Sequence, residues 1–160
     1  MADKKNENLL ITLIEESMRK HWQLTALSDL GGINYKYSEL AVTIEKLHIL
    51  FEHAGLKPGD KVAICGKNSS NWMVVFMACL TSGMVAVPIL HEFKPDMVHH
   101  LLVHSESRLL FVDQSIWENL DEKLLPNIEG VIYISELGMP ISRNKNLTDA
   151  RTNLNELFGK

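Results

Sequence analysis

The sequence predicts an α/β fold: a mainly parallel sheet with helices on both faces, preceded by an N-terminal helix and a short antiparallel strand pair. Between residues 61 and 134, short apolar runs alternate with segments of helical length. These runs are continuously apolar, which is typical of parallel strands covered on both sides. The chain has 160 residues, 46% of them hydrophobic, which suffices for one core. Residues 1–160 are therefore predicted to form a single domain.

The sequence of residues 1–60 indicates a helix, a hairpin and a second helix. Apolar side chains recur at helical spacing over residues 6–20. Two short strands, near 26–27 and 35–37, flank a Gly-Gly turn. Ser38 is predicted to cap the next helix, and Gly55 to end it.

Residues 61–135 predict the alternating core. A strand over "KVAIC" leads to a helix capped by Ser69-Ser70 and ended by Gly83. The strand "MVAVPI" precedes a helix from Pro95 to about Ser105. The strands "RLLFVD" and "GVIYI" then flank a helix over Ile116–Leu125. In residues 136–160, we expect "SELGMPISRNKN" to give a mobile loop and Thr148–Phe158 to be helical.

Charge and cysteine usage exclude several classes of protein. The net charge is −4, and the Lys and Arg residues are scattered among Asp and Glu. Because they do not cluster into a basic surface, we expect no nucleic-acid partner. Cys65 and Cys79 lie inside apolar runs, which favours a reduced, cytoplasmic compartment. The apolar stretch "LLITLI" is too short for a signal peptide, and no segment approaches the roughly 20 apolar residues of a membrane span.

The stretch "CGKNSSNW" begins like a phosphate-binding loop. A P-loop requires G-x-x-x-x-G-K-[ST], so Gly66-Lys67 would need Gly at 61 and Ser or Thr at 68. Lys61 and Asn68 stand there instead. We therefore predict that Asn68, Ser69 and Ser70 provide turn and capping chemistry and contact no ligand.

Three histidines, His99, His100 and His104, fall on one predicted helix. His100 and His104 are four residues apart and could bind a metal ion from one face. No third ligand is evident, so an exposed polar helix face is the preferred interpretation. Lys61 and Lys67 could contact an anion, but isolated lysines beside a strand are usually solvated.

Two apolar helices each allow two interpretations. The N-terminal helix could lie on a membrane, but Glu15 and Glu16 on its polar side favour packing against the domain. The helix after Ser69-Ser70 is apolar on every side, and core packing is preferred to an acyl tunnel. The side chains concerned are Trp72, Met73, Phe76, Met77 and Leu80.

The segment "GLKPGDKVAICGKNSSNWMVVFMACLTSGMVAVPI" resembles the N-terminal part of the adenylate-forming acyl-CoA synthetase family. "YSEL" upstream and "HSESRLLFVD" downstream resemble further segments of that family. The resemblance covers residues 8–135 and is specific as an ordered set, with long-chain fatty acid–CoA ligases most similar. It departs from them at Val87-Pro88, where they usually have Tyr-Pro or Asn-Pro. The matching positions are Gly55, Gly59-Asp60, Val62-Ala63-Ile64, Asn68-Ser69, Trp72, Gly83 and Val87-Pro88.

The resemblance implies an ATP-dependent fatty acid–CoA ligase as the longer parent of this chain, with ATP, Mg²⁺ and coenzyme A as its cofactors. The family's T-S-G-T-T-G phosphate loop, its Y-G-x-T-E segment, its ribose-binding Asp and its C-terminal lysine do not occur here. We therefore expect no catalytic, cofactor-binding or metal-binding residue in this chain, and no activity from it alone.

The implied partners are a fatty acid and the remainder of the parent, which we expect beyond Lys160. We expect the isolated chain to form a homodimer through apolar surface that this remainder would cover. The resemblance implies a cytoplasmic parent and leaves peripheral membrane association open. The alternative is a free-standing, flavodoxin-like binding module, which would bind its ligand at the carboxyl ends of the strands.

Overall fold

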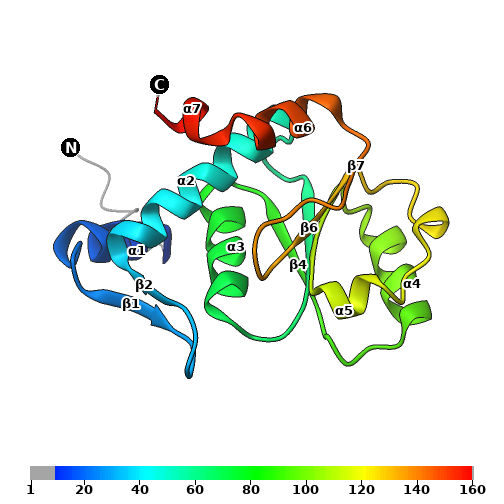
Figure 1. The fold of residues 1–160 in the computed structure, drawn as a ribbon, viewed down its shortest axis with the longest axis horizontal. Coiled ribbons are helices and arrows are strands. Elements are labelled where there is room, and N and C mark those ends of the chain that lie inside the picture. The colour runs from blue at the N-terminus through cyan, green and yellow to red at the C-terminus, as the bar shows by residue number, and fades with distance from the viewer. Residues whose placement is uncertain (1–9, 160) are drawn as a thin grey trace, which may run out of the picture.

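The computed structural model describes residues 10–159. A five-stranded sheet lies at the centre, and the first helix and the hairpin of the chain lie to one side of it, at the left in Figure 1. In chain order the elements are α1 (Leu10–Lys20), β1 (Thr25–Ser28), β2 (Asn34–Lys36), α2 (Tyr37–His53), β3 (Lys61–Cys65), α3 (Ser70–Thr81), β4 (Val85–Ile89), α4 (Pro95–Ser105), β5 (Leu109–Val112), α5 (Gln114–Trp117), the 3-10 turn η1 (Glu122–Leu124), β6 (Gly130–Tyr133), β7 (Ile141–Ser142), α6 (Lys145–Thr152) and α7 (Leu154–Phe158).

The sheet has the strand order β4-β3-β5-β6-β7, and its first four strands are parallel. Val62 of β3 pairs with Ala86 of β4 on one side and with Leu109 of β5 on the other. Only β7 runs antiparallel, against β6. The alternation of strand and helix predicted for residues 61–134, and with it the α/β class, is confirmed.

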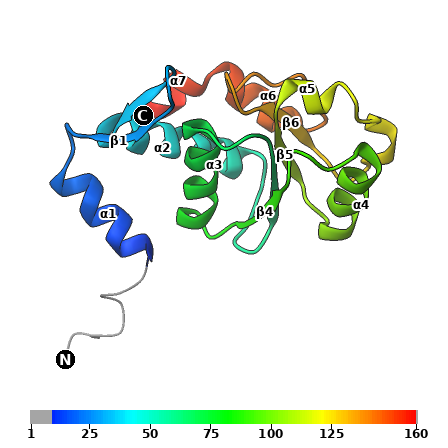
Figure 2. The same ribbon diagram turned by 90° about the horizontal axis from the view of Figure 1, so that it is seen from below.

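Successive residues of the central strands face two separate cores. Val62 and Ile64 join a core with α2, α3 and α6, whereas Ala63 and Cys65 join a core with α4. Figure 2 shows α3 and α4 on opposite sides of the sheet. Because both faces are covered, both sets of strand residues must be apolar, which explains the continuous apolar runs in the sequence.

The region before the sheet is more loosely attached. The strands β1 and β2 form the predicted antiparallel pair. Helix α1 contacts α2, as expected, but none of its residues is buried. Figure 2 shows α1 standing away from the sheet. The predicted residues 6–9 of this helix lie outside the described part of the chain.

The predicted helix ends are confirmed at Gly55 and Gly83 and wrong at Ser38. Both glycines have positive φ, 71° and 75°, as the residue after a helix commonly does. Helix α2 begins two residues earlier than a cap at Ser38 would place it, at Tyr37, with Lys36 as its N-cap. The reason is that the Glu39 carboxylate reaches back to accept the Lys36 backbone N–H at 2.9 Å.

The single helix predicted over Ile116–Leu125 is wrong. The structure has the short helix α5 and then the turn η1. Asp121 separates them: its carboxylate accepts the Lys123 N–H at 3.0 Å, and its own N–H donates to the His99 ring at 2.9 Å. These two bonds replace the hydrogen bonds that a continuous helix would make.

The carboxyl-terminal region is more ordered than its sequence indicates. The expected loop contains β7, a two-residue strand preceded by Pro140 and too short to show a pattern. The sheet therefore extends past residue 135. The helix predicted over Thr148–Phe158 is divided into α6 and α7 at Asn153, and Asn144 caps α6 by accepting the Leu147 N–H at 3.2 Å.

Helix α3 does not bury all of its apolar side chains, so the core-packing interpretation holds only for its inner side. Its sheet-facing side carries small side chains such as Val74, Val75 and Ala78, which are buried. The five large side chains singled out in the sequence are half-buried on its outer side, because helical spacing places them opposite the buried side chains. They are Trp72, Met73, Phe76, Met77 and Leu80.

Candidate functional site

The carboxyl edge of the parallel strands is where an α/β sheet usually binds a ligand. Within this edge, the crevice forms where connections leave neighbouring strands in opposite directions. Here that point lies between β3 and β5. The connection from β3 leads to β4 on one side, and the connection from β5 leads to β6 on the other. The loop at residues 66–69, which follows β3, and Asp113, which follows β5, meet there.

This crevice is filled by the protein's own side chains. A Cβ at Gly66 would lie 2.6 Å from Ile134 Cδ1 and 2.8 Å from Asp113 Oδ1. The next residue, Lys67, donates its backbone N–H to Asp113 Oδ2 at 2.8 Å. The N–H that would bind a phosphate in a P-loop is thus engaged by a carboxylate, and the loop joins β3 to β5.

The polar residues of the loop have unequal roles. Ser69 Oγ accepts the Trp72 N–H at 3.1 Å and caps α3, as the sequence predicts. Asn68 is exposed, and its side chain has no hydrogen-bond partner within residues 10–159, so the capping role predicted for it is wrong.

The two candidate lysines are not brought together. Lys67 extends from the carboxyl edge and is exposed. Lys61 begins β3 at the opposite edge, where its Nζ lies 3.8 Å from Glu106 Oε2. The pair therefore does not form an anion site.

A polar network at the start of α3 was not predicted from the sequence. Asp29, from the β1–β2 turn, accepts both the backbone N–H and the hydroxyl of Ser70, at 2.8 and 2.9 Å. Asn71 donates to the carbonyls of Ile134 and Ser135, at 2.8 and 2.9 Å. These partners are 41 to 64 residues apart in sequence, and no local pattern could have indicated them.

Tyr35 completes this network. Its hydroxyl donates to Asn71 Oδ1 at 2.7 Å. Burial raises the pKa of the Tyr35 phenol, so the group stays protonated and keeps its proton for Asn71. The network fixes the hairpin to α3 and to the end of β6, and every group in it has a protein partner.

Neither cysteine can act as a nucleophile at neutral pH. Burial raises the pKa of Cys65 to about 11 and that of Cys79 to about 12. Both are free thiols buried in the core. Because the thiolate is the reactive form, both residues serve packing alone.

The prediction that all three histidines lie on one exposed helix face is wrong for His99. His99 is buried, only 9% exposed, and its Nε2 accepts the Asp121 N–H at 2.9 Å. Its Nδ1 has no partner among the described atoms. His100 and His104 are exposed and stack with ring centroids 5.9 Å apart. Within residues 10–159, no three His, Cys, Asp or Glu side chains are grouped closely enough to bind a metal ion.

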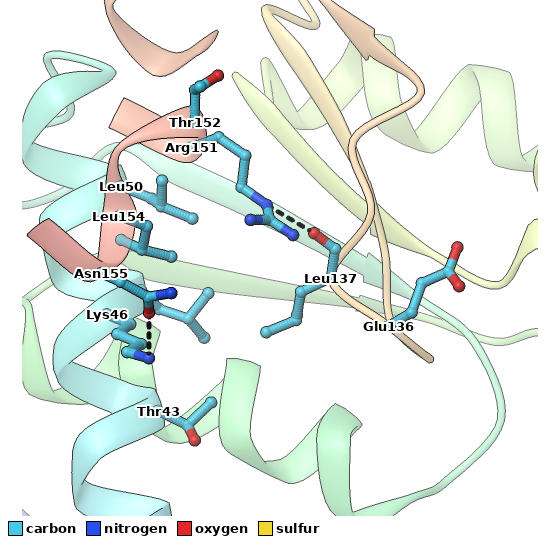
Figure 3. A pocket seen from close by; sticks show the side chains of 10 residues that line it. Thr43, Lys46, Leu50, Glu136, Leu137, Arg151, Thr152, Leu154 and Asn155 are labelled. Atoms are coloured by element: carbon cyan, nitrogen blue, oxygen red, sulfur yellow. Dashed lines mark hydrogen bonds between the residues drawn. The ribbon is translucent and has the colours of Figure 1, made fainter. Parts of the chain in front are cut away.

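A hollow of about 240 Å³ lies between α2, α6, α7 and the turn after β6. Figure 3 shows Arg151 pointing to Leu137, whose carbonyl accepts from its Nε at 3.0 Å, while Glu136 points away. Lys46 donates to Asn155 Oδ1 at 2.8 Å. Leu50 and Leu154 contribute apolar side chains to its wall. Lys46 thus ties α7 to α2, whereas Arg151 ties α6 to the turn after β6. No hydrogen-bonded pair of acid and base lines this hollow.

The loop after β3 and the crevice beside it do not fit MgATP. The crevice at the switch point is closed by Asp113 and Ile134, and the spacing around Gly66-Lys67 differs from that of a P-loop. No described helix is long and apolar enough to span a bilayer.

Comparison with known proteins identifies the family. The family model described as "AMP-binding enzyme" matches residues 14–155. Fatty acid–[acyl-carrier-protein] ligase ScoC of Streptomyces coeruleorubidus is 26% identical over 136 residues, 84% of this chain and 26% of ScoC. Long chain acyl-CoA synthetase 4 of Arabidopsis thaliana is 31% identical over 78 residues, 49% of this chain and 12% of that protein.

A solved structure shows the same fold. Coronafacic acid ligase from Pectobacterium brasiliense superposes with a TM-score of 0.73 at 21% identity, over 79% of this chain and 25% of the ligase. The chain therefore spans about a quarter of the length of ScoC and of this ligase. The match over residues 14–155 covers most of the chain and shows that it belongs to the AMP-binding enzyme family.

Proposed function

We propose that this chain is the amino-terminal structural part of an ATP-dependent fatty acid–CoA ligase. The observation that carries the proposal is the family match over residues 14–155, together with relatives named for fatty-acid and long-chain acyl substrates. The ordered motif set that resembles long-chain ligases supports the same substrate class.

In the proposed reaction, a carboxylate oxygen of the fatty acid attacks the α-phosphorus of ATP. Pyrophosphate leaves and an acyl-adenylate forms. The thiol of coenzyme A then attacks the acyl carbon, and AMP leaves. Such phosphoryl chemistry requires positive charge on the phosphates, which Mg²⁺ commonly supplies.

We assign the binding of ATP, Mg²⁺ and coenzyme A to protein other than residues 10–159. The contacts at the switch point support this assignment, because Asp113 engages the Lys67 N–H and Gly66 has no free space beside it. The role left to this chain is to form a rigid sheet on which the catalytic part is built. Its two free, buried cysteines support a cytoplasmic location.

The test begins with the gene. We expect the reading frame to continue past Lys160 into a stretch resembling T-S-G-T-T-G. The product of that longer frame should release pyrophosphate from ATP in the presence of oleate, and form oleoyl-CoA when coenzyme A is added.

Parallel reactions with oxalate and benzoate test the substrate class. Faster release with either acid than with oleate would contradict a fatty-acid substrate while leaving the ligase chemistry intact. A stop codon directly after Lys160 would contradict the proposal and favour a free-standing binding module.

A further inference from the structure

One continuous apolar surface remains uncovered on this molecule. On α1, Leu10, Ile11 and Leu13 are 58%, 44% and 49% exposed. On α3, the large side chains of the outer side are half-buried, and the rings of Trp72 and Phe76 stack with centroids 5.4 Å apart. We call this surface the α1–α3 face, and it comprises Leu10, Ile11, Leu13, Trp72, Met73, Phe76, Met77 and Leu80.

Two grooves connect the helices of this face. A groove of about 240 Å³ is lined by Leu10 and Leu13 of α1 and by Met77 of α3. A second groove, of about 340 Å³, extends from Ile11 to Thr81 at the end of α3. The first groove joins Leu10 and Leu13 to Met77, and Met77 lies on the same outer side of α3 as Met73 and Phe76 at helical spacing, so these apolar side chains are not isolated. A contiguous apolar surface of this kind marks an interaction site.

The charge pattern of the face suits contact with a copy of itself. Helix α3 contains no charged residue between Ser70 and Thr81. On α1, Arg19 pairs with Glu15 at 2.6 Å and Lys20 with Glu16 at 3.2 Å, so its charges are compensated within the helix. In a two-fold symmetric contact each residue set meets itself, and any uncompensated charge would oppose a like charge. Glu45 and His48 also line the second groove, where Glu45 Oε2 lies 3.4 Å from His48 Nδ1. The eight side chains of the face itself carry no charge, although the chain as a whole carries −4.

We propose that the α1–α3 face binds a second copy of this chain in a symmetric dimer. The free edges of the sheet are poorer candidates, because the edge strand β4 contains Pro88, which has no N–H to donate, and β7 has only two residues. A lipid surface is a poorer partner as well, since interfacial helices carry a basic polar face and α1 has as many acidic as basic residues. This inference is independent of the proposed ligase function.

The test is sedimentation velocity on the purified chain across a series of micromolar concentrations. We expect wild type to sediment as a dimer. The variants Leu13→Glu and Ile11→Glu should each weaken dimerisation by at least about tenfold, because each places two like charges in the contact. Both side chains are exposed, so the fold should be retained, and far-ultraviolet circular dichroism checks this. Leu124→Glu is the matched control: Leu124 is 53% exposed and lies on η1, away from the face.

Loss of the dimer in both α1 variants, with retention in the Leu124 variant, would support the proposed face. A monomeric wild type would overturn the proposal. A dimer that persists in Leu13→Glu and Ile11→Glu would also overturn it, as would equal weakening by Leu124→Glu. If wild type were monomeric but bound phosphatidylcholine vesicles, the face would be assigned to lipid and the dimer rejected.

Discussion

Two aspartates organise the carboxyl edge of the sheet by accepting hydrogen bonds from backbone N–H groups. Asp113 accepts from Lys67, and Asp29 accepts from Ser70. Backbone N–H groups at the start of a helix are the usual donors to a bound phosphate. In this chain, the carboxylates of Asp113 and Asp29 accept these hydrogen bonds in place of a phosphate. The same local geometry therefore links segments of the protein to one another.

Ser69 and Asn68 provide a matched pair of substitutions at this joint. Ser69→Ala should lower the free energy of unfolding by about 1 kcal/mol, because it removes the cap on the Trp72 N–H. Asn68→Ala should stay within about 0.5 kcal/mol of wild type, since this exposed side chain has no partner among the described residues. Urea unfolding followed by tryptophan fluorescence measures both, and equal effects would contradict the assignment.

Glu129 makes stability depend on pH. Burial alone would raise the pKa of this carboxyl, but hydrogen bonds from Arg108 at 2.6 Å and Asn144 at 2.8 Å outweigh it and hold the pKa below its ordinary value of 4.5. A carboxyl with a lowered pKa in the folded state stabilises the protein above its ordinary pKa. That contribution is lost as the pH falls through the lowered pKa.

We therefore expect Glu129→Gln to be less stable than wild type at neutral pH. The difference in free energy of unfolding should shrink below about pH 4. Urea unfolding at a series of pH values measures it, and Arg108→Gln should show the same trend because it removes the other partner. A difference that stays constant with pH would show that the ion pair contributes no pH dependence.

At the scale of elements, one close approach packs α6 against β6. A Cβ on Gly130 of β6 would lie 2.5 Å from Leu147 Cδ2, so the glycine creates the space that Leu147 fills. Leu147 is fully buried and joins the core with α2 and α3. The position of α6 against the sheet is therefore set by the packing of Leu147 against Gly130.

Leu147→Ala should lower the free energy of unfolding by about 2–5 kcal/mol, because it leaves a cavity against β6. Asn146→Ala, at the exposed neighbouring position, should have an effect within about 0.5 kcal/mol. Thermal and urea unfolding measure both variants. A small effect of Leu147→Ala would mean that α6 is not part of the cooperative core.

At the scale of the whole molecule, the chain carries the family's fold over about a quarter of the length of its relatives. Its strands and helices enclose two cores, and Asp113 and Ile134 close the switch-point crevice of the sheet. The described residues thus supply architecture, and we assign the chemistry to protein outside them.

We expect the isolated chain to release no pyrophosphate from ATP, Mg²⁺ and oleate above a control without protein. Calorimetry should likewise detect no tight binding of ATP, because Asp113 engages the Lys67 N–H of the loop that resembles a P-loop. Lys67→Ala should change neither result. Micromolar ATP affinity that is lost in Lys67→Ala would show that the loop after β3 is a nucleotide site.

The sequence by itself determined the α/β class, the order of elements between residues 61 and 134, and the helix ends at Gly55 and Gly83. It also determined that Gly66-Lys67 lacks P-loop spacing. These features depend on local periodicity and on backbone conformations that few residue types adopt, so they can be read from neighbouring residues. For the same reason the ordered motifs sufficed to indicate the family.

Only the tertiary structure decided where partners far apart in the sequence meet. It divided the predicted helix after β5, because Asp121 bonds to His99, and it buried His99 in place of exposing it. It added β7 by pairing two residues with β6, and it decided that α3 buries Val74, Val75 and Ala78 against the sheet while its large side chains face outward. It also closed the switch-point crevice through Asp113. Each outcome depends on a contact between residues distant in sequence, whose energy no local pattern contains.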